Sequence, residues 1–122
     1  MPNVLHWTLV FTPSSLEHLA ERDITEDDVT DTVFGSFGPP FVRKFGRGHE
    51  LRWSVIAPLE GGALLSCVLR QAVPRDVSTE GAFAIPATGM PEEPRVLKAS
   101  MRLCVSARLA SADEVHNGQE EK

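Results

Sequence analysis

The sequence lacks any run of about eighteen uninterrupted apolar residues, which is the length that a membrane-spanning helix requires. It also lacks the basic start and apolar stretch of a secretion signal, because the chain opens with Met1-Pro2-Asn3. We therefore expect a soluble, cytoplasmic protein with no membrane partner. With 122 residues, 42% of them hydrophobic, the chain can form one core of modest size, so a single domain is expected.

Cysteine is scarce, and Cys67 and Cys104 are the only two. Each lies in an apolar, strand-like run, where a reduced thiol behaves as a small hydrophobic core residue. We predict buried free thiols rather than a disulfide. Neither cysteine has a histidine or another cysteine at ligand spacing, so we expect no metal site and no cofactor. The glycine-flanked nucleophile of serine hydrolases and the phosphate-binding loop are missing as well.

The charge of the chain is unevenly distributed. Its formal net charge of -5 argues against a protein that coats nucleic acid over its whole surface. Acidic residues concentrate in residues 17–31, in residues 76–93 and in the tail. The segment 43–52, in contrast, contains one acid, Glu50, and four basic residues, which are Arg43, Lys44, Arg47 and Arg52. The sequence therefore predicts a local basic patch on an acidic protein.

The N-terminal third predicts one strand and two short helices. Residues 4–11 form an apolar-rich run of strand length. Thr12 can cap the helix that follows, with a proline at its first position, and this helix is expected to end near Asp23. Thr25 opens a second capping box, and the helix that it starts is expected to stop at Gly35.

From Phe41 onward the apolar residues recur at every second position, with a turn at residues 46–48, which predicts an antiparallel hairpin. A third strand over residues 63–69 is apolar on both faces and is expected to be central in the sheet. Residues 71–95 are rich in proline and glycine and predict a long loop. One more strand is expected over residues 95–106.

The fold class that follows is α+β. An N-terminal strand and two short helices pack on an antiparallel meander, with the long loop at 71–95 and a short C-terminal helix opened by a capping box at 111–114. We expect one domain over residues 1–116 and a disordered tail over residues 117–122.

Three segments, taken in their order along the chain, resemble the BrnT-like small toxins of the RelE-type fold and a neighbouring family of toxin-like domains. They are Phe11 to Thr25 at the helices, Glu50 to Val55 in the sheet, and Ser106-Ala107-Arg108 before the last capping box. The resemblance covers most of the chain and is interrupted at residues 71–95. It implies the bacterial toxin of a type II toxin-antitoxin system, which is a metal-independent endoribonuclease whose partners are RNA and a small antitoxin protein.

Cleavage of RNA through the ribose 2′-hydroxyl needs a group that moves a proton and cations that stabilise charge on the phosphoryl oxygens. Histidine suits the first role, and arginine or lysine suits the second. The candidate catalytic residues lie at the hairpin and at the ends of two later strands, and they are His49, Arg52, Arg70 and Arg108. The candidate RNA-binding residues lie on the hairpin and the first helix, and they are Arg43, Lys44, Arg47, Arg22 and His18. We expect Arg52 and Arg70 to lie near one face of the sheet.

Other interpretations of the same residues stay open. Charged side chains commonly protect an exposed strand edge, and Ser14, His18 and Arg22 are spaced as on an ordinary solvated helix face. The neighbouring family usually has a histidine and an arginine where this chain has Ser14 and His18. The alternatives to a ribonuclease are therefore a catalytically inactive relative that acts as a protein-binding module, and an RNA binder that does not cleave. The oligomeric state is left open, and a homodimer is one of the options.

Overall fold

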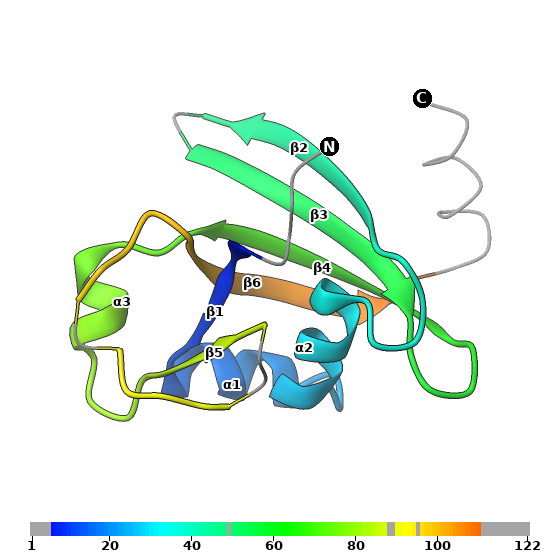
Figure 1. Cartoon of the computed structure of the whole chain (residues 1–122), viewed down its shortest axis with the longest axis horizontal. Coiled ribbons are helices and arrows are strands. Elements are labelled where there is room, and N and C mark those ends of the chain that lie inside the picture. The colour runs from blue at the N-terminus through cyan, green and yellow to red at the C-terminus, as the bar shows by residue number, and fades with distance from the viewer. Residues whose placement is uncertain (1–5, 49, 88–89, 95, 111–122) are drawn as a thin grey trace.

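The computed structural model describes residues 6–48, 50–87, 90–94 and 96–110. In this part of the chain the strands are β1 (Thr8–Phe11), β2 (Phe41–Arg47), β3 (Glu50–Pro58), β4 (Leu64–Gln71), β5 (Phe83–Pro86) and β6 (Met101–Leu109). The helices are α1 (Pro13–Ala20), α2 (Glu26–Phe34) and α3 (Pro74–Ser78). The described strands form one six-stranded sheet in the order β2-β3-β4-β6-β1-β5 (Figure 1). The fold is therefore α+β, as predicted.

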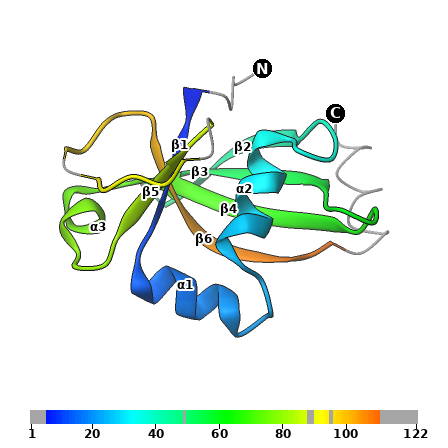
Figure 2. The same ribbon diagram turned by 60° about the horizontal axis from the view of Figure 1, so that its bottom comes forward.

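Pairing within the sheet is antiparallel except between β1 and β6, which run parallel. The meander β2-β3-β4 agrees with the prediction, and β4 is central because β3 and β6 flank it. Figures 1 and 2 show α1 and α2 on the same side of the sheet, while α3 lies apart from them, near the end of β4.

The first two helices begin at the predicted caps. The Thr12 hydroxyl accepts a hydrogen bond from the Ser15 N–H at 3.1 Å, and the Ser15 hydroxyl oxygen accepts one from the Thr12 N–H at 2.9 Å. Thr25 and Asp28 repeat this capping box at the start of α2. Helix α2 ends at Gly35, whose φ of 70° is a left-handed conformation that glycine adopts at little cost. Local signals therefore determine both helices.

The sheet has a large core on the face covered by α1 and α2. This core holds the alternate residues of the central strands together with Leu19, Val29 and Val33 of the two helices. A small second cluster lies on the opposite face, where Val77 of α3 and Leu97 pack against buried residues of the strands and the segment after β4, which are Val10, Ala72, Ala84 and Met101. The rest of that second face carries the side chains of β2, β3 and β4 that point away from the large core, among them Arg43, Arg52 and Arg70.

Cys67 and Cys104 are free and buried in the large core, as predicted. They lie on the neighbouring strands β4 and β6. The contact with the Cys104 thiol and burial both raise the pKa of Cys67. Because the thiolate is the reactive form of cysteine, the Cys67 thiol is a structural group rather than a nucleophile.

The prediction of a long loop over residues 71–95 is wrong in part, because α3 and β5 lie in this segment. Both elements are too short to produce a periodic pattern. Strand β5 is stabilised by distant partners, since it pairs with β1 and its Phe83 ring stacks on Phe11 with centroids 5.4 Å apart. On the edge of β5 that does not face β1, Ala84 forms an isolated bridge with Glu92.

The ends of two strands also differ from the prediction. The last strand begins at Met101 rather than near residue 95, because the Met101 N–H closes a turn onto the Lys98 carbonyl at 3.1 Å. The first strand begins at Thr8 within the described residues. The predicted capping box at 111–114 and the tail at 117–122 lie outside the described residues.

One cation lies against two buried tryptophan rings of the large core, which also contact each other edge to face. The Cζ atom of Arg102 lies 4.3 Å from the Trp53 ring centroid and 5.2 Å from that of Trp7. Its Nη1 donates hydrogen bonds to the carbonyls of Ala99 at 2.6 Å and Met101 at 3.1 Å. Burial lowers the pKa of Arg102. The guanidinium therefore joins the turn before β6 to the two rings.

Replacing Arg102 by methionine should lower the free energy of unfolding by about 1–3 kcal/mol, because the variant keeps an apolar stem but loses the ring contacts and the bonds to two carbonyls. Urea denaturation followed by tryptophan fluorescence measures this change. Lys98→Met is a matched control, because Lys98 is exposed and should move the free energy by no more than about 0.5 kcal/mol. Equal midpoints for Arg102→Met and the unaltered protein would show that the stacked cation adds nothing.

Candidate functional site

A hollow of about 440 Å³ opens where β1 ends and α1 begins. Strand β6 is paired with β1 only as far as Leu103, so α1 takes the place of β1 beside the rest of β6. The polar lining comes from the start of α1 with its cap Thr12, from β4 and from α3. These residues are Thr12, Ser14, Ser15, His18, Arg70, Arg75, Asp76 and Thr79. Residues 103–105 of β6 also line the hollow.

A β-bulge lies at this point of β6. Leu69 of β4 is opposite Cys104, whereas Val68 is opposite Ser106, so Val105 is the extra residue. A bulge bends its strand and changes the direction of nearby side chains, and bulges are common beside functional sites. Val105 is one of the residues that line the hollow.

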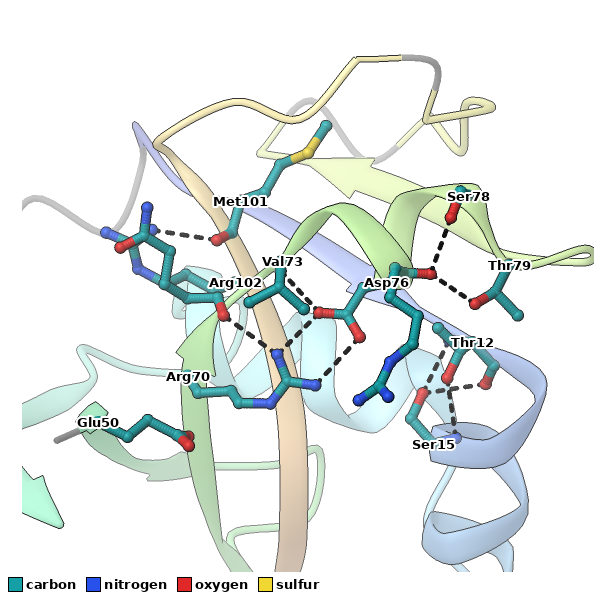
Figure 3. A network of polar contacts seen from close by, with 12 residues as sticks. Thr12, Ser15, Glu50, Arg70, Val73, Asp76, Ser78, Thr79, Met101 and Arg102 are labelled. Carbon is teal, nitrogen blue, oxygen red and sulfur yellow. Dashed lines mark hydrogen bonds and ion pairs between the residues drawn. The ribbon is translucent and has the colours of Figure 1, made fainter. Parts of the chain in front are cut away.

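The strongest polar contact in the hollow is a bidentate ion pair between Arg70 and Asp76 (Figure 3). Nη1 of Arg70 lies 2.7 Å from Oδ2 of Asp76, and Nη2 lies 3.0 Å from Oδ1. Asp76 Oδ2 also accepts the backbone N–H of Val73 at 2.8 Å, which caps α3. The side chains are only 18% and 8% exposed, so little solvent weakens the pair. Strand β4 and helix α3 are thereby held together.

Burial acts to raise the pKa of Asp76, but the hydrogen bonds from Arg70 and Val73 and the charges of Arg70 and Arg75 outweigh it, so the pKa lies below its ordinary value. The hydrogen bond to Asp76 in turn raises the pKa of Arg70. Both groups are therefore charged at neutral pH. Arg70 also donates from Nη1 to the Gln71 carbonyl at 3.1 Å. These three bonds use three of its five N–H groups and leave out Nε–H and one Nη2–H.

Asp76→Asn should lower the free energy of unfolding at pH 7 by about 1–3 kcal/mol, because a buried arginine loses its charged partner. The folded pKa of Asp76 lies below the unfolded value of about 3.9, so this stabilisation is present above that pH and is lost as the pH falls through the folded pKa. In urea denaturation, the difference between the two proteins should therefore shrink as the pH is lowered below about 3.9.

The matched control for that measurement is Asp23→Asn, because Asp23 is exposed and has a φ of 57° that asparagine tolerates. It should change the free energy of unfolding by less than about 0.5 kcal/mol at either pH. A destabilisation by Asp76→Asn that stays constant from neutral to acidic pH would contradict the ionic role of this carboxylate.

The structure brings together two of the four candidate catalytic residues. Arg52 lies directly opposite Arg70 in the register of β3 and β4, on the sheet face away from α1 and α2, as expected. Nε of Arg52 donates to Glu50 Oε1 at 3.0 Å. Arg108 lies opposite Ser66, four positions from Arg70 along β4 and thus roughly 13 Å away, so the structure does not bring it to the pair. His49 lies outside the described residues.

The candidate RNA-binding residues are spread over two parts of the fold. His18 lines the hollow, and its Nδ1 lies 3.8 Å from the Glu21 carboxylate. Arg22 is exposed in the turn after α1 and is not part of the hollow's lining. On β2, Arg43 shares the sheet face of Arg52, and Lys44 is on the other face. Arg47 pairs with Glu50 at the end of the hairpin, and its side chain is not among those described.

The sequence prediction missed Arg75 and Asp76, because they fall in the segment assigned to a loop. A local signal was present, since Pro74 at the first helical position and an acid two residues later form a helix start. Without a periodic apolar pattern after it, that signal was not sufficient. No local feature indicated that α3 would lie against the end of β4.

No group of three histidine, cysteine or acidic residues suited to a metal ion occurs among the described residues. None of the helices in the described ranges has the length and apolar character needed to cross a membrane. Comparison of the chain with protein-family models, curated proteins and solved structures gives no match.

Proposed function

We propose that the chain is a toxin-like endoribonuclease that cleaves RNA through the ribose 2′-hydroxyl without a metal ion and is inhibited by a small antitoxin protein. The observation that carries this proposal is the convergence of His18, Arg70 and Arg75, from three different elements, on one hollow. These residues are the types that proton transfer and phosphate binding require. The resemblance to BrnT-like toxins supports the same function.

In the proposed reaction a phosphodiester of the RNA lies in the hollow. Arg75 and the free N–H groups of Arg70 donate to its non-bridging oxygens and stabilise the charge that grows on them. His18 takes the proton of the 2′-hydroxyl as the 2′-oxygen attacks phosphorus. The bond from phosphorus to the 5′-oxygen breaks, and this oxygen takes up a proton from solvent. The products are a 2′,3′-cyclic phosphate and a 5′-hydroxyl end.

The remaining basic residues extend the site along the sheet. Arg52 lies next to Arg70 across the strands, and Arg43 lies on the same face, one strand further out. A nucleic acid backbone that leaves the hollow in this direction meets a succession of cations. Because phosphate contacts release counterions, the affinity for RNA should fall steeply as the salt concentration rises.

Incubation of the purified chain with an RNA oligonucleotide should yield fragments that end in 2′,3′-cyclic phosphate, identified by mass spectrometry. An oligonucleotide of the same sequence with 2′-O-methyl groups should stay intact, because it has no hydroxyl to attack. His18→Ala should lower the cleavage rate about 10²- to 10⁴-fold, as expected for loss of a general base. Arg75→Ala should lower it as well, through lost charge stabilisation.

Matched controls are His6→Ala and Lys98→Ala, since His6 and Lys98 are exposed and do not line the hollow. Both should cleave at the unaltered rate, and circular dichroism checks that each variant is folded. Intact RNA at stoichiometric protein would rule out the enzyme. Binding that weakens with salt, but without cleavage, would then identify an RNA binder.

A further inference from the structure

Arg70 and Arg75 also border a second hollow, of about 580 Å³, which lies at the end of β4. Its apolar lining includes Leu51 of β3, Val73 and Pro74 before α3, and Leu97. Its polar lining, apart from the two arginines, is Glu50 and Gln71. The two hollows therefore share the arginines as a common border, and a ligand held by the arginines in one hollow extends naturally into the other.

Two apolar residues of this second hollow are unusually open to solvent for their type. Leu51 is 40% exposed and Val73 is 41% exposed. Apolar surface of this kind beside a few fixed polar groups is typical of a small-molecule subsite. The volume lies in the range of such pockets and is sufficient for a nucleoside.

The polar groups favour particular hydrogen-bond donors. Glu50 Oε1 accepts from Arg52, which orients the carboxylate and leaves Oε2 as an acceptor. Figure 3 shows the Glu50 side chain extending toward Arg70. Gln71 is exposed and uses its backbone carbonyl for Arg70, so its side-chain amide is not needed for that bond. A carboxylate accepts hydrogen bonds from exocyclic amino groups, such as that of cytosine, and repels the carbonyl oxygen that uracil has instead.

We infer that the second hollow binds the nucleobase adjacent to the phosphate held by Arg70 and Arg75, and that Glu50 selects a base with an exocyclic amino group. This inference rests on the proposed function, since it concerns the same substrate. Leu51, Val73 and Leu97 contact the flat faces of the base, Glu50 accepts from its amino group, and Gln71 lies beside its edge. The arginines attract the phosphate, so a nucleotide satisfies both the charge and the apolar surface.

Cytidine and uridine monophosphates provide the sharpest test, because at the base edge they exchange an amino group for a carbonyl. Isothermal titration of the purified chain with the 3′- and 5′-monophosphates should show tighter binding of the cytidine compound by about tenfold for the preferred isomer. Glu50→Gln should bring the two affinities close to equality, because an amide donates and accepts. Leu51→Ser should weaken both nucleotides and leave the binding of inorganic phosphate unchanged.

Leu109→Ser is the matched control, because Leu109 is 62% exposed on β6 and borders neither hollow. It should leave both nucleotide affinities unaltered. Amide chemical shifts of the unaltered protein should locate cytidine monophosphate at residues 50–51 and 71–73, so the test does not depend on whether a variant folds. Equal affinities for the two bases, no nucleotide binding at all, or shifts confined to other residues would overturn the inference.

These outcomes are independent of catalysis. If RNA stays intact but the cytidine preference and its loss in Glu50→Gln are observed, the base subsite is retained and the ribonuclease is rejected. If RNA is cleaved but the two nucleotides bind equally, the ribonuclease is retained and the base subsite is rejected. The failure of one proposal is therefore distinguishable from the failure of the other.

Discussion

The Arg70–Asp76 ion pair is the contact on which the candidate site depends. Asp76 accepts two hydrogen bonds from Arg70 and one from the Val73 backbone, so a single carboxylate fixes the end of β4 and the start of α3. Helix α3 has only 5 residues, and a helix of that length is not stable by itself in water. Because Arg75 belongs to that helix, its position beside Arg70 follows from the same carboxylate. Both hollows share this border, and neither would keep its shape if α3 separated from β4.

The first hollow exists because β1 is short. Strand β6 has 9 residues and β1 has 4, so most of β6 would lack a neighbour on that side. Helix α1 begins immediately after β1 and lies against β6, but a helix cannot pair with a strand edge as closely as another strand does. The extra residue Val105 bends β6 at the same place. A parallel pair of unequal length, a capped helix and a bulge together leave the space into which His18 and Arg70 project.

Local sequence signals were sufficient for much of this fold. The caps at Thr12 and Thr25, the stop at Gly35 and the alternation of the hairpin depend on neighbours in the chain, and so does the placement of Arg52 opposite Arg70 once the meander is accepted. The rest depends on distant partners. Nothing near β1 indicates that it pairs parallel to β6, more than ninety residues away along the chain. The bulge shifts the register of β6, and Arg75 enters the site only through the tertiary contact of α3. Sequence reasoning therefore found Arg52 and Arg70 of the sheet but not Arg75 of the short helix.

The charge balance of the candidate site determines how strongly it would attract the proposed ligand. Arg52 and Arg70 are each bonded to a carboxylate, Glu50 and Asp76 respectively, in a protein whose formal net charge is -5. An arginine paired in this way keeps its orientation but attracts a distant phosphate less strongly than an unpaired one does. Under the proposed function, phosphate contacts alone should therefore bind RNA only weakly. Specific affinity then has to come from a second contact in the same ligand. The apolar hollow beside the arginines is where such a contact can be made, so recognition of the phosphate and of its neighbouring base should act together.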